Sequence, residues 1–287
     1  MNGLKTVLLL GLLSGLLLAG GQAAAGKQGL YIGMALAIGM NFFSYFFSDK
    51  LALSMYSAQP VSESENRDVW RRVGPLVNSL CQRMDLPMPR LWVIPEDSPN
   101  AFATGRNPAH ASVALTAGLL GILDDRELEG VIAHELGHVK NRDILISAVV
   151  ATIAGTITML ARMVYYAELF GFGGGRSDDR RGGALSALAM MIVAPLAALL
   201  IQLAISRSRE YEADSTGARI TGNPQGLARA LGKIDKWSKR IPMQASPSMA
   251  HMFIIQPLTA GELFSSWFST HPPVRKRIER LIGRDFV

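Results

Sequence analysis

The 287-residue sequence has one cysteine, Cys81, and few charged residues for its length. A single cysteine cannot form an internal disulfide, so nothing indicates an oxidising compartment, and we interpret Cys81 as a buried, inert thiol. Charged residues make up 18% of the chain, against roughly 25% in a typical soluble domain, and hydrophobic residues make up 49%. The apolar residues gather in blocks, which is typical of a membrane protein rather than of one large soluble core.

The sequence also lacks basic stretches interleaved with aromatic residues, the pattern typical of nucleic-acid-binding proteins. The net charge is +6, but the basic residues are scattered and many lie next to apolar blocks, as do Lys50, Arg71, Arg72, Arg207 and Arg209. This distribution is typical of the cytoplasmic side of a membrane protein. We therefore predict a lipid bilayer, and no nucleic acid, as a partner.

Four apolar blocks predict about four transmembrane helices: residues 4–25, 30–47, 144–170 and 184–205. Each block reaches or approaches the roughly 20 residues that a membrane-spanning helix needs. The first block has an alternative interpretation, because Lys5, the apolar run after it and the small residues Gly21–Ala25 resemble a cleavable signal peptide. The second block follows almost at once, which favours a tight helical hairpin.

The polar segments between the blocks predict a mainly helical α+β fold with a small sheet. Residues 66–84 carry apolar side chains at helical spacing, and residues 91–94 and 112–115 have the pattern of short strands. Asp124, followed three residues later by Glu127, predicts a capping box at the start of another helix.

His134-Glu-Leu-Gly-His138 lies on this capped helix and fits the pattern H-E-x-x-H. Residues four apart lie one turn above each other, so the two imidazoles face the same way and offer a pair of zinc ligands. Glu135 projects to the side, where it can act as general base on a zinc-activated water. The motif predicts one Zn²⁺ per chain; the alternative is two ordinary histidines satisfied by hydrogen bonds.

A catalytic zinc site needs a third protein ligand. The metzincin form of the motif is excluded because Asn141 and Ile144 stand where it requires glycine and histidine. The candidates further along the chain are Glu168, Glu210, Glu212, Asp214, His251 and His271. Glu210 and Asp214 share a helix face, so one can bind metal while the other hydrogen-bonds a ligating histidine, and spacing favours Glu210 as the ligand without excluding Asp214. The alternative is a solvated acidic face paired with arginines.

Together these motifs resemble the HtpX family of bacterial membrane metallopeptidases. The resemblance rests on residues 134–138, on Glu210-Tyr-Glu-Ala-Asp214, and on the flanking stretches Asn100–Gly105 and Thr270–Pro273. It implies that Glu210 is the third zinc ligand. It also implies a gluzincin-type fold, a location in the bacterial inner membrane, and a role in the quality control of misfolded or damaged membrane proteins under stress.

On this interpretation the chain has four parts: two membrane helices (1–47), the first catalytic part (48–143), a membrane hairpin (144–205) and the second catalytic part (206–287). The hairpin must return the chain to the side that it left, because ligands before and after it meet at one ion. The positive charge that follows residues 47 and 205 predicts that the catalytic parts face the cytoplasm.

We expect substrate contacts at two places near the motif helix. One is the strand formed by Ser112, Val113, Ala114 and Leu115, which could pair with an extended peptide; the other is the stretch Asn100, Ala101 and Phe102. His271 is a candidate for stabilising the oxyanion, whereas His110 and His251 have structural interpretations. A competing hypothesis is a metal-binding membrane scaffold without hydrolytic activity, which would have no use for a carboxylate at Glu135.

Overall fold

The computed structural model describes residues 2–147, 149–150, 207–243, 252–255 and 272–283. Its helices and strands are, in chain order, α1 (Asn2–Met55), β1 (Gln59–Val61), α2 (Arg67–Met84), β2 (Arg90–Ile94), β3 (Ala101–Gly105), the short 3-10 helix η1 (Pro108–His110), β4 (Ala111–Thr116), α3 (Ala117–Ile122), α4 (Asp125–Lys140), α7 (Arg207–Thr221), α8 (Pro224–Ser238) and α10 (Val274–Ile282). The mainly helical α+β fold expected from the sequence is therefore present.

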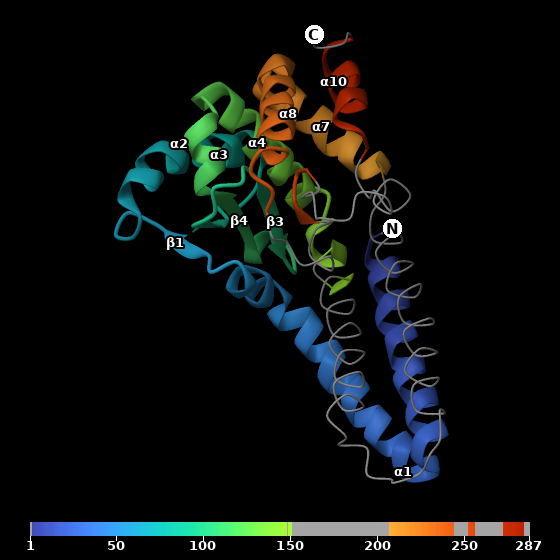
Figure 1. Cartoon of the computed structure of the whole chain (residues 1–287). Coiled ribbons are helices and arrows are strands. Elements are labelled where there is room, and N and C mark those ends of the chain that lie inside the picture. Colours follow the sequence, from blue (N-terminus) through green and yellow to red (C-terminus); the bar gives the residue numbers. More distant parts are fainter. Residues whose placement is uncertain (1, 148, 151–206, 244–251, 256–271, 284–287) are drawn as a thin grey trace.

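Helix α1 folds back on itself and projects from the rest of the described fold (Figure 1). The reversal lies at Gly26, whose φ of +58° suits glycine. The two arms approach so closely that a Cβ on Gly21 would lie 2.2 Å from the carbonyl oxygen of Gly29. Asn41 Nδ2 also donates to Ser14 Oγ across the arms (2.9 Å). This is the tight hairpin expected from the first two apolar blocks.

The second arm of α1 has the length and composition of a membrane span. Within the described residues, Gly26–Phe47 is the one segment long and apolar enough to cross a bilayer. The prediction of about four spans is thus supported at one of them. The later blocks, at 144–170 and 184–205, lie largely outside the described residues.

The sheet has four strands in the order β1-β2-β4-β3, with β2 and β4 parallel and the other two pairs antiparallel. The strands expected at residues 91–94 and 112–115 are confirmed as β2 and β4, whereas β1 and β3 were not predicted. One sheet face packs on α2 and α4, and the other packs against the last turns of α1 through Ala52 and Leu53. The sheet therefore joins the membrane-type helix to the rest of the fold.

Helix α4 is the centre of the helical layer. Its capping box is confirmed: Asp124 Oδ1 accepts from the Glu127 N–H, and Glu127 Oε2 accepts from the Asp124 N–H, both at 2.9 Å. Two glycines bring α4 and α7 together, because a Cβ on Gly217 would lie 3.1 Å from the His134 nitrogen and one on Gly137 would lie 3.3 Å from the Ala213 Cα. This close packing sets α7 against the H-E-x-x-H face of α4.

Candidate metal centre

Two imidazoles of α4 and one carboxylate of α7 converge at the contact between these helices. His134 Nε2 and His138 Nε2 lie 3.3 Å apart. Glu210 Oε2 lies 3.8 Å from His134 Nε2, and Glu210 Oε1 lies 3.6 Å from His138 Nε2. Of the third-ligand candidates within the described residues, Glu210 is thus the one grouped with both histidines. Glu212 is exposed on the same helix.

The spacing of the three donors fits a small tetrahedral cation. Ligands at about 2.0–2.1 Å from zinc in tetrahedral geometry are separated by roughly 3.3 Å, which matches the observed spacings to within about half an ångström. Nitrogen and carboxylate donors are also the ligand types that zinc binds in catalytic sites. The residues present therefore fit the metal that the motif implies.

Carboxylates behind both histidines orient the ring nitrogens. Asp214 Oδ1 lies 2.9 Å from His134 Nδ1, and Asp143 Oδ2 lies 3.2 Å from His138 Nδ1. Because an ionised carboxylate can only accept, each Nδ1 donates, and the lone pair of each Nε2 points toward the other ring and Glu210. Such an arrangement of lone pairs is stabilised by a cation between them.

The electrostatics of the site also favour a cation. Burial lowers the pKa of His138, but the hydrogen bond to Asp143 and the negative charges of Glu210 and Glu135 outweigh it and raise this pKa to about 9. A positive charge at His138 is therefore strongly stabilised, and a divalent ion at the same point would benefit from the same carboxylates. Glu210 and Asp214 are 7% and 3% exposed, so the alternative of a solvated acidic face is wrong.

Glu135 lines a narrow cleft next to His138 and Glu210, with Ala103 of β3 and the segment 252–254 on the other walls. Burial raises the pKa of the Glu135 carboxyl, while the two histidines partly oppose this effect. A carboxyl with a raised pKa can accept a proton from water and release it again near neutral pH. The side chain thus lies where the motif requires a general base.

Arg277 of α10 is a site residue that sequence reasoning missed. Its fully buried guanidinium donates from Nε to Asp214 Oδ2 (2.8 Å) and from Nη2 to Asp214 Oδ1 (2.7 Å). Its Nη1 donates to the Ile254 carbonyl (2.7 Å) and lies 3.8 Å from Glu210 Oε2. Arg277 therefore fixes the carboxylate that orients His134. The sequence offered one sign of its burial: Arg277 lies on the same side of α10 as the apolar residues of that helix.

The expectation that Ser112, Val113, Ala114 and Leu115 pair with substrate is wrong. These residues belong to β4, which is hydrogen-bonded to β2 on one side and to β3 on the other, so it has no open edge. The edge strand on this side of the sheet is β3, and its Ala103 lines the metal cleft. The sequence could not reveal this order, because β3 itself was not recognised as a strand.

The stretch Asn100, Ala101 and Phe102 supports the cleft wall, and its side chains do not line the cleft. Asn100 Nδ2 donates to the Ile255 carbonyl (2.9 Å), and the Ala101 carbonyl accepts from the Ile254 N–H (2.9 Å). Phe102 packs edge-on against Phe253, with ring centroids 5.3 Å apart. These contacts hold the segment 252–255 at the start of β3.

The other predicted histidines differ in position. His110 is exposed and hydrogen-bonds the Asn107 side chain, consistent with a structural role. His251 and His271 lie outside the described residues, so the proposed oxyanion role of His271 stays a prediction.

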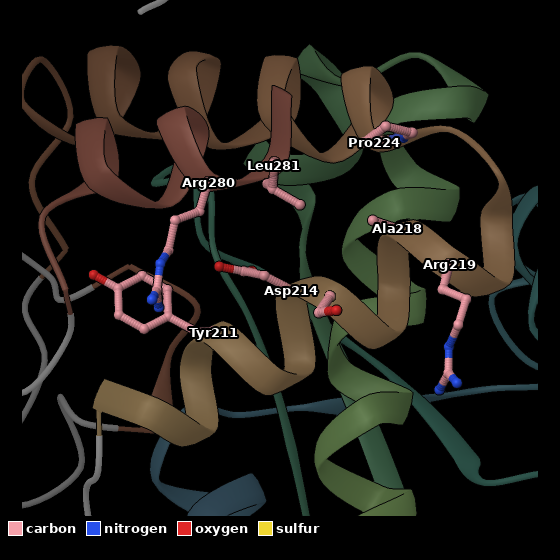
Figure 2. Close-up of a pocket in the computed structure, with 8 residues that line it drawn as sticks. Tyr211, Asp214, Ala218, Arg219, Pro224, Arg280 and Leu281 are labelled. Atoms are coloured by element: carbon pink, nitrogen blue, oxygen red, sulfur yellow. The ribbon is translucent and has the colours of Figure 1, made fainter. Parts of the chain in front are cut away.

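A second hollow, with a volume of about 540 Å³, is lined by residues of α7, α8 and α10 (Figure 2). Asp214 contributes to its wall, and Arg280 covers the Tyr211 ring at 3.9 Å. The labelled side chains come from α7, α8 and α10 and do not include the metal-binding groups (Figure 2). The hollow is therefore separate from the cleft that contains Glu135.

Comparison with known proteins gives matches along nearly the whole chain. Residues 64–285 match Peptidase family M48. A protein named Protease HtpX homolog from Desulforapulum autotrophicum is 51% identical over 282 residues, which cover 98% of this chain and 89% of that protein. A protein of the same name from Syntrophobacter fumaroxidans is 52% identical over 279 residues, covering 96% and 97%. The crystal structure of S. mikatae Ste24p has a similar fold, with a TM-score of 0.54 at 20% identity over 95% of this chain and 62% of that chain.

Proposed function

Since the chain belongs to the HtpX family of M48 peptidases and is a metalloprotease, we propose that it is a membrane-embedded zinc endopeptidase with the ligands His134, His138 and Glu210. The observation that supports this assignment best is the buried group of two Nε2 atoms and one carboxylate, all within 4.8 Å of one another. We assign one Zn²⁺ per chain, with Glu135 as the general base.

The geometry divides the chemistry among a few side chains. Zinc, when bound, supplies Lewis acidity that polarises a carbonyl and lowers the pKa of water to about 7. Glu135 takes a proton from the attacking water and delivers it to the leaving amine, for which its raised pKa is suited. Asp214 and Asp143 hold the imidazoles in the tautomer that directs Nε2 to the metal. A scaffold without hydrolytic activity would gain nothing from a buried carboxylate at Glu135.

The edge strand β3 is the proposed place for substrate backbone. Ala103 lines the cleft and β3 is an edge strand, so an extended peptide that binds in the cleft can add to the sheet along residues 103–105. Main-chain pairing requires little of the side chains, which suits an enzyme that cleaves many misfolded proteins. We therefore propose protein substrates, and membrane proteins in particular, as the partners.

We further propose a multi-pass location in the bacterial inner membrane, with 1–47 and 144–205 as the membrane parts and 48–143 and 206–287 as the catalytic parts facing the cytoplasm. Gly26–Phe47 supports a span at this end, and Lys50 follows it at once. The N-terminal arm packs through Leu13 on Ile146, Val149 and Val150, so the first and third apolar blocks are in contact.

The decisive experiment compares the purified full chain with its Glu135→Gln variant. The variant should keep zinc in elemental analysis, because Glu135 is not a ligand, and should lose at least about 100-fold in cleavage of an unfolded membrane-protein substrate. If the variant held as much zinc as the unsubstituted protein and kept full activity, Glu135 would not be the general base. Absence of metal from the wild-type protein would contradict the zinc site itself.

A further inference from the structure

Aromatic rings and two basic side chains gather where the candidate span of α1 ends. Phe42 and Phe43 are 58% and 46% exposed, and their rings contact those of Phe46 and Phe47 one turn on. Lys50 Nζ lies 5.3 Å from the centre of the Phe47 ring, and the Arg106 guanidinium lies 5.2 Å from that of Phe46. We call these six residues the interfacial cluster. Lys and Arg side chains near the end of a membrane span typically reach the level of the lipid headgroups, and here each of the two lies over an aromatic ring.

The charges of this cluster are available to an external anion. Within the described part of the chain, neither Lys50 nor Arg106 has a carboxylate within 4 Å, unlike Arg72 and Arg90, which pair with Asp125 and Asp49. Arg106 is only half-buried, and the next residues of its loop become more exposed toward Ala109 and His110. A row of headgroup phosphates has the complementary charge.

Arg106 belongs to the catalytic part and not to α1, which fixes how that part faces the bilayer. The last turns of α1 are joined to the sheet by the Asp49–Arg90 ion pair (3.1 Å) and by buried packing of Ala52 and Leu53. Because α1 and the sheet are packed together, the position of Arg106 along the axis of α1 is fixed. Arg106 lies beside Phe46, which is one residue before the end of the candidate span at Phe47.

The direction of β3 follows from two contacts along α1. Phe102 lies beside Tyr56, with ring centroids 6.2 Å apart, whereas Arg106 lies over Phe46. The ten residues from Phe46 to Tyr56 span about 15 Å at helical rise, and the four residues from Phe102 to Arg106 span about 13 Å as a strand. Strand β3 therefore runs antiparallel to α1, toward the end of the span.

We propose that the loop of residues 106–110 contacts the bilayer through Arg106, which with Lys50 binds the phosphates of anionic phospholipid headgroups. The proposal rests on the membrane location proposed above. Its consequence is that the Gly105 end of the substrate-binding edge opens on the membrane surface. Peptide paired with β3 can then enter the metal cleft directly from the headgroup layer.

Site-directed fluorescence in nanodiscs tests the position of the loop. The native Cys81 is buried and burial raises its pKa to about 11, so an introduced exposed cysteine is labelled selectively. Three full-chain variants carry the environment-sensitive label: Ala109→Cys in the loop, Leu36→Cys in the candidate span and Lys236→Cys on the exposed face of α8. Nitroxides on the headgroup or in the middle of the acyl chain serve as quenchers.

Each label has a distinct expected result. Headgroup nitroxide should quench most of the Ala109→Cys signal, mid-chain nitroxide should quench Leu36→Cys, and neither should quench Lys236→Cys. A quenched Leu36→Cys with an unquenched Ala109→Cys would overturn the loop contact and leave the membrane location intact. If Leu36→Cys were also unquenched, the membrane location itself would be wrong.

A second measurement tests the phosphate contact. With the quencher carried on phosphatidylglycerol or on phosphatidylcholine at equal amounts, the Ala109→Cys label should be quenched more strongly by the anionic lipid. Arg106→Gln should remove this preference. The matched control is Arg240→Gln, which also removes a guanidinium from an aromatic ring, that of Trp237 at 5.6 Å, and should leave the preference unchanged. Equal quenching of the Ala109→Cys label by both lipids while Arg106 is retained would contradict binding of anionic headgroups.

Discussion

At the scale of single residues, Arg277 connects three parts of the fold that are distant in sequence. Its guanidinium binds both oxygens of Asp214 on α7 and the carbonyl of Ile254 at the cleft wall, while Asp214 binds His134 on α4. Burial alone would raise the pKa of Asp214, but the charge and hydrogen bonds of Arg277, with His134, hold it well below its usual range. The ionised carboxylate that orients His134 therefore depends on Arg277.

We predict that Arg277→Leu destabilises the protein by about 3–5 kcal/mol, because it leaves the Asp214 carboxylate buried without its cationic partner. Arg277→Lys keeps the charge but not the planar fork, so it should recover only part of the loss. Thermal unfolding in detergent measures the stability of both variants.

The control is Arg275→Leu on the same helix. The ion pair between Arg275 and Glu279 is largely exposed, so this substitution should cost at most about 1 kcal/mol. Equal stability of Arg277→Leu and Arg275→Leu would contradict this account.

Two neighbouring glutamates on α7 provide an internal test of the metal ligand. Glu210 is buried beside His134 and His138, whereas Glu212 is exposed. Glu210→Ala should lose most of its zinc in elemental analysis, because two imidazoles alone hold the ion weakly. Glu212→Ala should retain zinc at the level of the unsubstituted protein. The opposite pattern would move the third ligand to Glu212.

At the scale of helices and strands, the sequence was sufficient to predict those features that depend only on residues close together in the chain. The capping box of α4, the i,i+4 histidines and the i,i+4 acids of α7 each depend on residues within one or two turns. Strand β3 could not be recognised, because Ala101–Gly105 is buried on both faces and lacks the polar–apolar alternation of a half-exposed strand. The wrong assignment of the substrate edge to β4 followed, since strand order is set by contacts between distant segments.

The start of α4 supports the motif helix, so we predict a measurable cost for removing its cap. Asp124→Ala should reduce the free energy of unfolding by about 1 kcal/mol. The hydrogen bond from the Glu127 backbone lowers the pKa of Asp124, so this stabilisation is complete above the pKa in the unfolded chain and is lost as the pH falls through the folded-state value. Unfolding of both proteins at neutral and acidic pH measures the difference, which should shrink in acid. A difference that is constant with pH would contradict a charged cap.

At the scale of the whole molecule, packing holds the candidate metal site at a fixed height relative to the candidate span. The α1 hairpin is attached at both ends: its second arm packs on the sheet, and its first arm packs on residues that follow α4 in the chain. The site is built from α4 and α7, which lie before and after the apolar residues 144–205. On the proposed function, the position of the substrate relative to the bilayer is therefore set by the fold rather than by a flexible linker.

This fixed height leads to a prediction about where membrane proteins are cut. Arg106, at the proposed headgroup level, lies three residues after Ala103 at the cleft, which corresponds to about 10 Å at the rise of an extended strand. Reporters with one membrane anchor and an unstructured cytoplasmic segment should therefore be cleaved preferentially about three to five residues from the anchor, with the cut sites mapped by mass spectrometry. Glu135→Gln identifies cuts made by contaminating proteases. Cleavage spread evenly along a long segment would show that substrate reaches the cleft from the aqueous side instead, because bonds far from the bilayer would then be as accessible as those beside it.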